Sequence, residues 1–254
     1  MNKNMRYWAM CVIAAVVLIL ITVFTISNNN RKGYTETTVQ EDQQHAMDQQ
    51  ETGENGVNNQ KLQNDSARQR SEARLDKDNL NRYLHKQDDI LSDMMKAMKT
   101  IPKTGNASID FLEAMVPCNE AAIGLAESYL LYGGNDEALA ALAEDVILNQ
   151  DNEIIQFQKL MKKYQSESHV NEDKENAFLD DYDTMLDQDH DIDKSGTQSL
   201  EHAFSEGMIA HHKITVELEK SIAEYTDYEE IRTLAENLLA NQKEEMEKLS
   251  EYVP

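Results

Sequence analysis

The chain has 254 residues, a formal net charge of −23 at pH 7 and 28% charged residues. Binding to nucleic-acid phosphates needs clustered lysine and arginine, so this acidity excludes a nucleic-acid-binding protein and favours attraction of cations. The two cysteines, Cys11 and Cys118, lie in different segments far apart in the sequence, and we expect no intrachain disulfide.

Residues 7–26 form an almost uninterrupted apolar run, preceded by Lys3 and Arg6. About twenty helical residues at ~1.5 Å each match the ~30 Å hydrocarbon core of a bilayer. Because no small-residue cleavage site follows the run, we expect an uncleaved signal anchor; a removed signal peptide is the alternative. The basic residues favour a cytoplasmic stub at residues 1–6 and an exported remainder, periplasmic or at the cell surface.

Residues 27–73 are rich in Asn, Gln, Asp and Glu and contain almost no large apolar residue. Such a segment buries too little apolar surface to offset the entropy of ordering. We expect a disordered polar linker that holds the following domain away from the membrane.

Apolar residues at helical spacing predict three helices after the linker. The first runs from about residue 74 and ends before Pro102; the second covers about 108–132, contains Pro117 and is followed by two glycines; the third covers about 136–164. The pattern then recurs, with helices expected over about 173–190, 199–225 and 228–252.

The recurrence is an internal repeat. Met115 and Met208 are 93 residues apart, and Gln150 and Gln242 are 92 apart. The repeat predicts two units, 74–165 and 166–254, whose apolar faces pair into an all-α four-helix bundle with the two leading helices packed alongside.

Several motifs in this order resemble the Domain of Unknown Function 305 family, ferritin-like helical proteins that include CopM-like copper-binding proteins of the bacterial envelope. The matching segments are Met94-Met95 with Met98, Thr104-Gly105-Asn106, Asp110-Phe111, Met115-Val116-Pro117, Gln150 with Glu153-Ile154, Met208-Ile209-Ala210-His211-His212, and Gln242 with Glu245-Met246. The resemblance implies a ferritin-like bundle that binds copper.

The chain departs from the family pattern mainly at metal-ligand positions. Where the family has paired histidines, the first unit has Cys118 and Asn119, whereas the second unit keeps His211 and His212. Thioether and imidazole donors suit copper, and sulfur-rich sites favour Cu(I). The expected metal ligands are Met94, Met98, Met115, Cys118, Met208, His211 and His212. Met208 precedes the two histidines by three and four residues, so a helix brings the three toward one face.

Other metal chemistries fit less well. A di-iron carboxylate bundle needs Glu-x-x-His on two helices, and the sequence contains none. Residues 191–202 resemble a calcium loop, but His202 occupies the position of the bidentate glutamate. A further alternative is that each of these methionine and cysteine side chains is a buried packing residue and not a metal ligand.

No nucleophile constellation and no glycine-rich phosphate loop occurs, so we expect no enzymatic activity. The sequence therefore predicts a membrane-tethered, extracytoplasmic bundle that binds copper ions for buffering or resistance, with a partly degenerate site. The alternative is a structural or protein-interaction module that keeps only the family fold. The expected partners are a metal ion and the membrane; the sequence identifies no protein partner.

Overall fold

A computed structural model describes residues 55–254 except 168, 189, 191, 193, 195 and 254, with side chains from residue 68 onward. The chain divides into two compact parts, Met1–Arg68 and Gln69–Pro254, and the fold below is that of the second part, which contains both repeat units. The predicted stub, signal anchor and the first part of the linker lie outside the described residues, as do Asp191, Asp193 and Ser195 of the calcium-like loop.

The described residues are all-α and contain no strand. The helices are α2 (Asn55–Met98), α3 (Ala107–Leu131), α4 (Glu137–Gln165), α5 (Glu172–Leu186), α6 (Leu200–Tyr225) and α7 (Glu229–Ser250). None of them is both long and apolar enough to span a bilayer.

The helix ends follow local sequence signals. α2 stops shortly before Pro102, and α3 ends ahead of Gly133, whose φ of 98° is suited to glycine. Asn106 and Ser199 cap α3 and α6 through side chains that accept backbone N–H bonds, and they are 93 residues apart, as the repeat requires.

The start of α2 differs from the prediction. The helix begins at Asn55, so residues 55–73, expected to belong to the disordered linker, are helical. After Gly56 this stretch contains no glycine or proline, and its Gln, Arg and Ala residues favour helix even without an apolar face. Apolar periodicity finds helices that bury a stripe, and it misses a helix whose side chains are exposed, as they are from Arg68 to Lys77.

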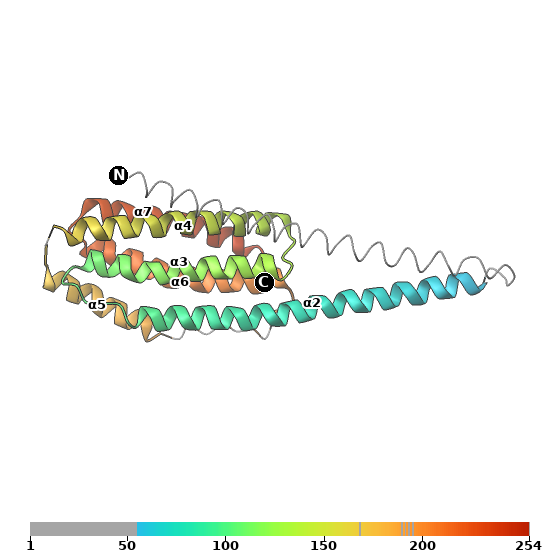
Figure 1. Ribbon diagram of the computed structural model, residues 1–254. Helices are drawn as coiled ribbons and strands as arrows, with labels where there is room; N and C mark the ends of the chain where they lie inside the picture. Colours follow the sequence, from blue (N-terminus) through green and yellow to red (C-terminus); the bar gives the residue numbers. More distant parts are fainter. Residues whose placement is uncertain are drawn as a thin grey trace, which may run out of the picture. The chain divides into compact units, whose positions relative to one another are not determined.

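Helices α3, α4, α6 and α7 form the four-helix core, and α2 and α5 flank it, as the repeat predicts. The closest backbone approaches join α3 to α4, α6 to α7 and α3 to α6, while α5 packs on α6 and α3 (Figure 1). A groove separates α4 from α7. Each unit therefore contributes one hairpin, and the hairpins meet through α3 and α6.

Helix α2 docks through a close contact with α6. The Gln87 side-chain Nε2 donates a hydrogen bond of 2.9 Å to the Ala203 carbonyl. A Cβ added at Gly207 would lie 1.9 Å from that nitrogen, so only glycine leaves room for the contact. The glycine that precedes the histidine segment thus serves the packing of the flanking helix.

The loop between α2 and α3 is tied to the start of α5. Gly105, with φ of 81°, donates its N–H to Glu175 Oε1 at 2.5 Å, and its carbonyl accepts the Asn171 N–H at 2.9 Å. Asp110 accepts bonds from the backbone and hydroxyl of Thr104. The Thr-Gly-Asn segment therefore fixes the junction of the two units.

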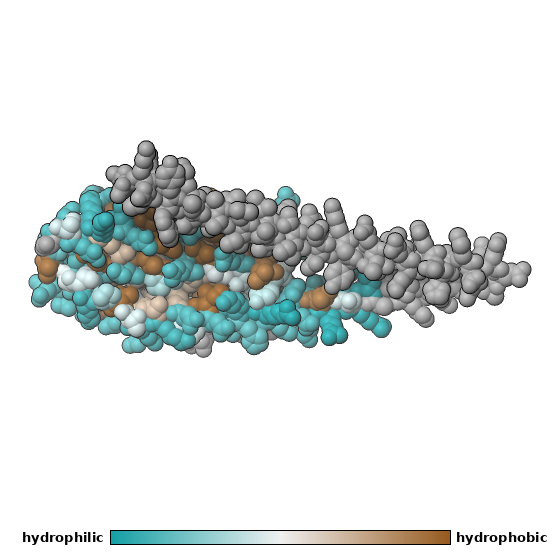
Figure 2. Space-filling model, viewed as in Figure 1, coloured by the Kyte–Doolittle hydropathy of each residue, from teal (hydrophilic) through white to brown (hydrophobic). Residues whose placement is uncertain are grey.

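Apolar side chains fill two clusters along the bundle. One contains Met94, Met98, Met115 and Cys118 and extends to α5 and α7; the other surrounds Phe204 and Met208. The face shown in Figure 2 is mostly hydrophilic, with apolar residues between the polar ones, in keeping with the strongly acidic composition.

Candidate metal centre

The two histidines of α6 lie in the bundle interior. His211 is 1% exposed and His212 is 0% exposed, and their ring centroids are 5.2 Å apart in an edge-to-face arrangement. Neighbouring residues on a helix point about 100° apart, so the two imidazoles contact different helices. His211 contacts α3 and His212 contacts α7.

His211 presents an unused nitrogen. Its Nε2 lies 2.8 Å from the Cys118 carbonyl oxygen, which can only accept, so Nε2 carries the proton and Nδ1 keeps its lone pair. Nδ1 is buried and has no hydrogen-bond partner. Burial, together with neighbouring His212, lowers the pKa of His211 to about 3, so the ring is neutral at physiological pH and is a competent metal ligand.

His212 is directed to α7. Its Nε2 lies 3.0 Å from Glu245 Oε2, yet neither ring nitrogen makes a hydrogen bond of acceptable geometry. A buried polar atom without a hydrogen-bond partner costs roughly 1–3 kcal/mol of folding free energy. A ligand that binds to this imidazole would recover part of that cost.

The sulfur atoms gather mainly on the α2–α3 side of the core. The Cys118 thiol donates to Met98 Sδ at 3.6 Å, and both residues are 0% exposed. Met94 and Met115 belong to the same apolar cluster, whereas Met208 belongs to the other. Cys118 therefore contacts both Met98, through its thiol, and His211, through its carbonyl oxygen. Met208 lies among different neighbours.

The cysteine is a thiol in the absence of metal. Cys118 forms no disulfide, and burial, reinforced by the charge of Glu219, raises the pKa of its thiol far above the ordinary value. Metal binding at Cys118 would require loss of this proton, which a bound cation promotes.

The internal repeat reveals a second feature, a matched pair of contacts. Asn119 Nδ2 donates to Glu153 Oε2 at 2.9 Å in the first unit, and His212 Nε2 lies 3.0 Å from Glu245 Oε2 in the second. Asn119 and His212 are repeat equivalents, as are Glu153 and Glu245. From the sequence, these glutamates matched the family motif but were not predicted to belong to the site. Their recurrence 92 residues apart, beside Gln150 and Gln242, could have identified them as site residues.

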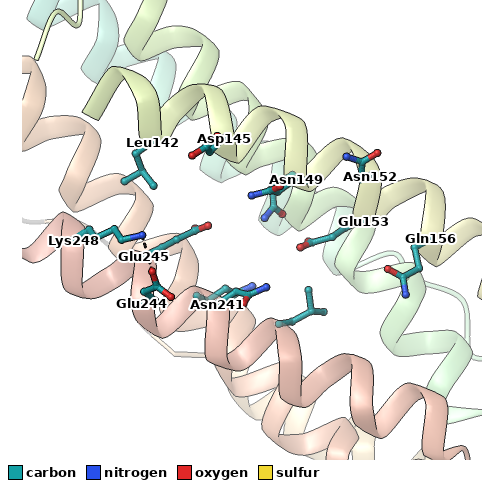
Figure 3. A pocket seen from close by; sticks show the side chains of 13 residues that line it. Leu142, Asp145, Asn149, Asn152, Glu153, Gln156, Asn241, Glu244, Glu245 and Lys248 are labelled. Carbon is teal, nitrogen blue, oxygen red and sulfur yellow. Dashed lines mark ion pairs between the residues drawn. The ribbon is translucent and has the colours of Figure 1, made fainter. Parts of the chain in front are cut away.

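Both glutamates line the groove between α4 and α7, which has a volume of about 410 Å³. Figure 3 shows Glu153 and Glu245 extending into the groove from opposite walls. The buried amides of Gln150 and Gln242 also line it. Its one lysine, Lys248, pairs with Glu244 at 2.8 Å, and the structure gives Lys248 no ion pair with the other carboxyl groups of the groove.

The interior behind the groove disfavours negative charge. Burial raises the pKa of Glu219 to about 9, with a further contribution from Glu153. Burial and the nearby Glu245 raise the pKa of Glu153 to about 7, against the opposing hydrogen bond from Asn119. Carboxyl groups in such surroundings bind either a proton or a metal cation.

Within the described residues, no three His, Cys, Asp or Glu side chains converge closely enough to hold a metal ion. The donors are brought together two at a time: Cys118 with Met98, and His212 with Glu245. Any site that uses more of them needs side-chain rotation.

The duplicated helical units and their polar interior define an all-α bundle protein with imidazole, thiol and thioether groups in its core. The chain belongs to the family described as Domain of unknown function (DUF305), which it matches over residues 29–161 and 108–253. The two matches overlap over residues 108–161.

Among solved structures, the chain is similar to CopM in its silver-bound form obtained by soaking. The sequence identity is 21%, the TM-score is 0.43, and the similarity covers 57% of this chain and 93% of that one. No curated protein matches the chain.

Proposed function

We propose that this protein is a membrane-tethered, extracytoplasmic copper-binding bundle that buffers or carries copper ions at a partly degenerate site. The ion is cargo, bound by the Cys118 thiolate, the Met98 thioether and the unprotonated nitrogen of His211. The proposed tether is the apolar run at residues 7–26, and the basic residues before it support a location outside the cytoplasm.

The buried, unpartnered Nδ1 of His211 carries this proposal. The nitrogen lies on a ring that is anchored through Nε2 to the carbonyl of Cys118, whose own thiol touches Met98. Sulfur and imidazole together are the donor types that Cu(I) prefers. Methionine side chains are flexible, so Met98 can reorient toward a bound ion.

A structural or protein-interaction module is the second candidate. It is favoured by the lack of a converged ligand triad in the described part of the chain and by the elevated pKa of the Cys118 thiol. In that case the thiol and thioether are packing groups, and the polar interior is a remnant of a former metal site.

Titration of the full-length protein with Cu(I) against a competing chromophoric chelator separates the two functions. The copper proposal expects stoichiometric binding, weakened at least about tenfold by Cys118→Ala and by Met98→Leu, because each removes a donor. Met246→Leu is the matched control, since Met246 lies on α7 outside both apolar clusters. Absence of binding by the unmutated protein supports the structural module.

A further inference from the structure

Buried acceptors outnumber donors beneath the α4–α7 groove. Asn119 Oδ1, Gln150 Oε1 and Glu245 Oε2 have no hydrogen-bond partner. His212 offers at most two N–H groups, and the Asn119 amide nitrogen already donates to Glu153 and to the Gln150 carbonyl. An interior with this imbalance favours an electropositive guest.

The acceptors are aimed at one place because the fold is duplicated. Gln150 and Glu153 on α4 correspond to Gln242 and Glu245 on α7, and the two helices face each other across the groove. Figure 3 shows the carboxyl groups of Glu153 and Glu245 directed into the same space. Gln150 lines the groove and is 3% exposed, and the completely buried His212 lies 3.0 Å from Oε2 of the groove residue Glu245, so partly exposed carboxylates adjoin buried, unsatisfied polar groups.

We propose that this groove is a second metal site, one that binds a divalent cation of the Zn²⁺ or Cu²⁺ type through Glu153, Glu245 and His212. Imidazole combined with carboxylate is the donor set of such borderline cations, whereas Mg²⁺ and Ca²⁺ favour oxygen alone. The site differs from the Cu(I) site proposed above, because it uses carboxylate and imidazole donors in place of the sulfur atoms of Cys118 and Met98.

The site closes by a limited rearrangement. Glu245 already lies 3.0 Å from the His212 nitrogen, so a cation between them needs that distance to widen. Glu153 must rotate away from Asn119, exchanging one hydrogen bond of 2.9 Å for a bond to the metal. The amide oxygens of Asn119 and Gln150, which have no partner in the protein, can accept hydrogen bonds from water molecules on the cation.

Zinc titration of the full-length protein, followed by competition with a chromophoric zinc chelator, tests the site. We expect binding of one Zn²⁺ and a loss of affinity of at least about tenfold in both Glu245→Gln and Glu153→Gln, which preserve side-chain shape. Glu244→Gln is the matched control: Glu244 lines the same groove but is paired with Lys248. The unmutated protein should also gain thermal stability on addition of zinc, and Glu245→Gln should gain less.

The proposal is overturned if the unmutated protein binds no zinc, or if Glu244→Gln weakens binding as much as Glu245→Gln does. Retained zinc binding in both glutamine variants would also overturn it and would point to water molecules as the partners of the buried acceptors. Met98→Leu should leave zinc affinity unchanged, and Glu153→Gln should leave Cu(I) affinity unchanged, so the two metal proposals can fail separately.

Discussion

Replacement of Glu219 by glutamine tests whether the interior of the bundle holds a proton. Glu219 is 0% exposed, and neither of its carboxyl oxygens has a hydrogen-bond partner. Its pKa rises from an ordinary value of 4.5 to about 9 in the folded protein. The folded state therefore keeps a proton that the unfolded chain releases, and stability falls as the pH rises from 4.5 toward 9.

The size of this change in the free energy of unfolding follows from the pH range between the two pKa values of Glu219. Each pH unit within it costs about 1.4 kcal/mol, so between pH 5 and pH 8 Glu219 alone removes about 4 kcal/mol from the free energy of unfolding. Glutamine keeps the shape and does not ionise. We expect Glu219→Gln to match the unmutated protein near pH 5 and to be more stable by a few kcal/mol at pH 8.

Urea unfolding of the metal-free protein, followed by circular dichroism at pH 5, 6, 7 and 8, measures the effect. Glu217→Gln is the control, because Glu217 lies two residues away on the exposed face of the same helix. The reasoning is refuted if Glu219→Gln has the same pH dependence as the unmutated protein, or if Glu217→Gln flattens it equally.

Three further changes test other contacts. Gly207→Ala should destabilise the protein by about 1–3 kcal/mol in urea unfolding, because the added Cβ displaces Gln87 from its bond to α6; an unchanged midpoint would show that this contact is dispensable. Tyr182→Phe should cost about 1 kcal/mol, since its hydroxyl donates to the last carbonyl of α2 at 2.7 Å, and equal thermal stability would contradict this. Asn119→His should tighten binding of zinc, because it places a second imidazole beside Glu153 as in the other unit; unaltered affinity would argue against the pairing of the two halves.

Most of the fold could be predicted from the sequence because its signals are local and repeated. Pro102, Gly133 and the recurrent apolar spacing fixed the ends of the helices to within a few residues, and the 93-residue repeat predicted which helices form the core. The start of α2 could not be found this way, since residues 55–73 carry no apolar stripe.

Only part of the candidate site could be predicted from the sequence. Helical spacing groups Met208 with His211 and His212, but spacing cannot state which neighbour each side chain meets. In the structure His211 contacts the Cys118 carbonyl and His212 approaches Glu245 from the neighbouring hairpin helix. These contacts depend on how the helices are rotated about their axes, which is set by packing of the whole core.

The polar groove between α4 and α7 has a consequence for motion. Three of the four lateral boundaries of the core are closed by near approach of backbones, while this one is lined mainly by amides and carboxyl groups, with Leu142 and Leu238 among them. Parting two surfaces that water solvates well costs less free energy than parting apolar ones. Native-state hydrogen exchange should therefore record the lowest-energy sub-global opening along this boundary, with α4 and α7 separating while the α3–α6 pair stays protected.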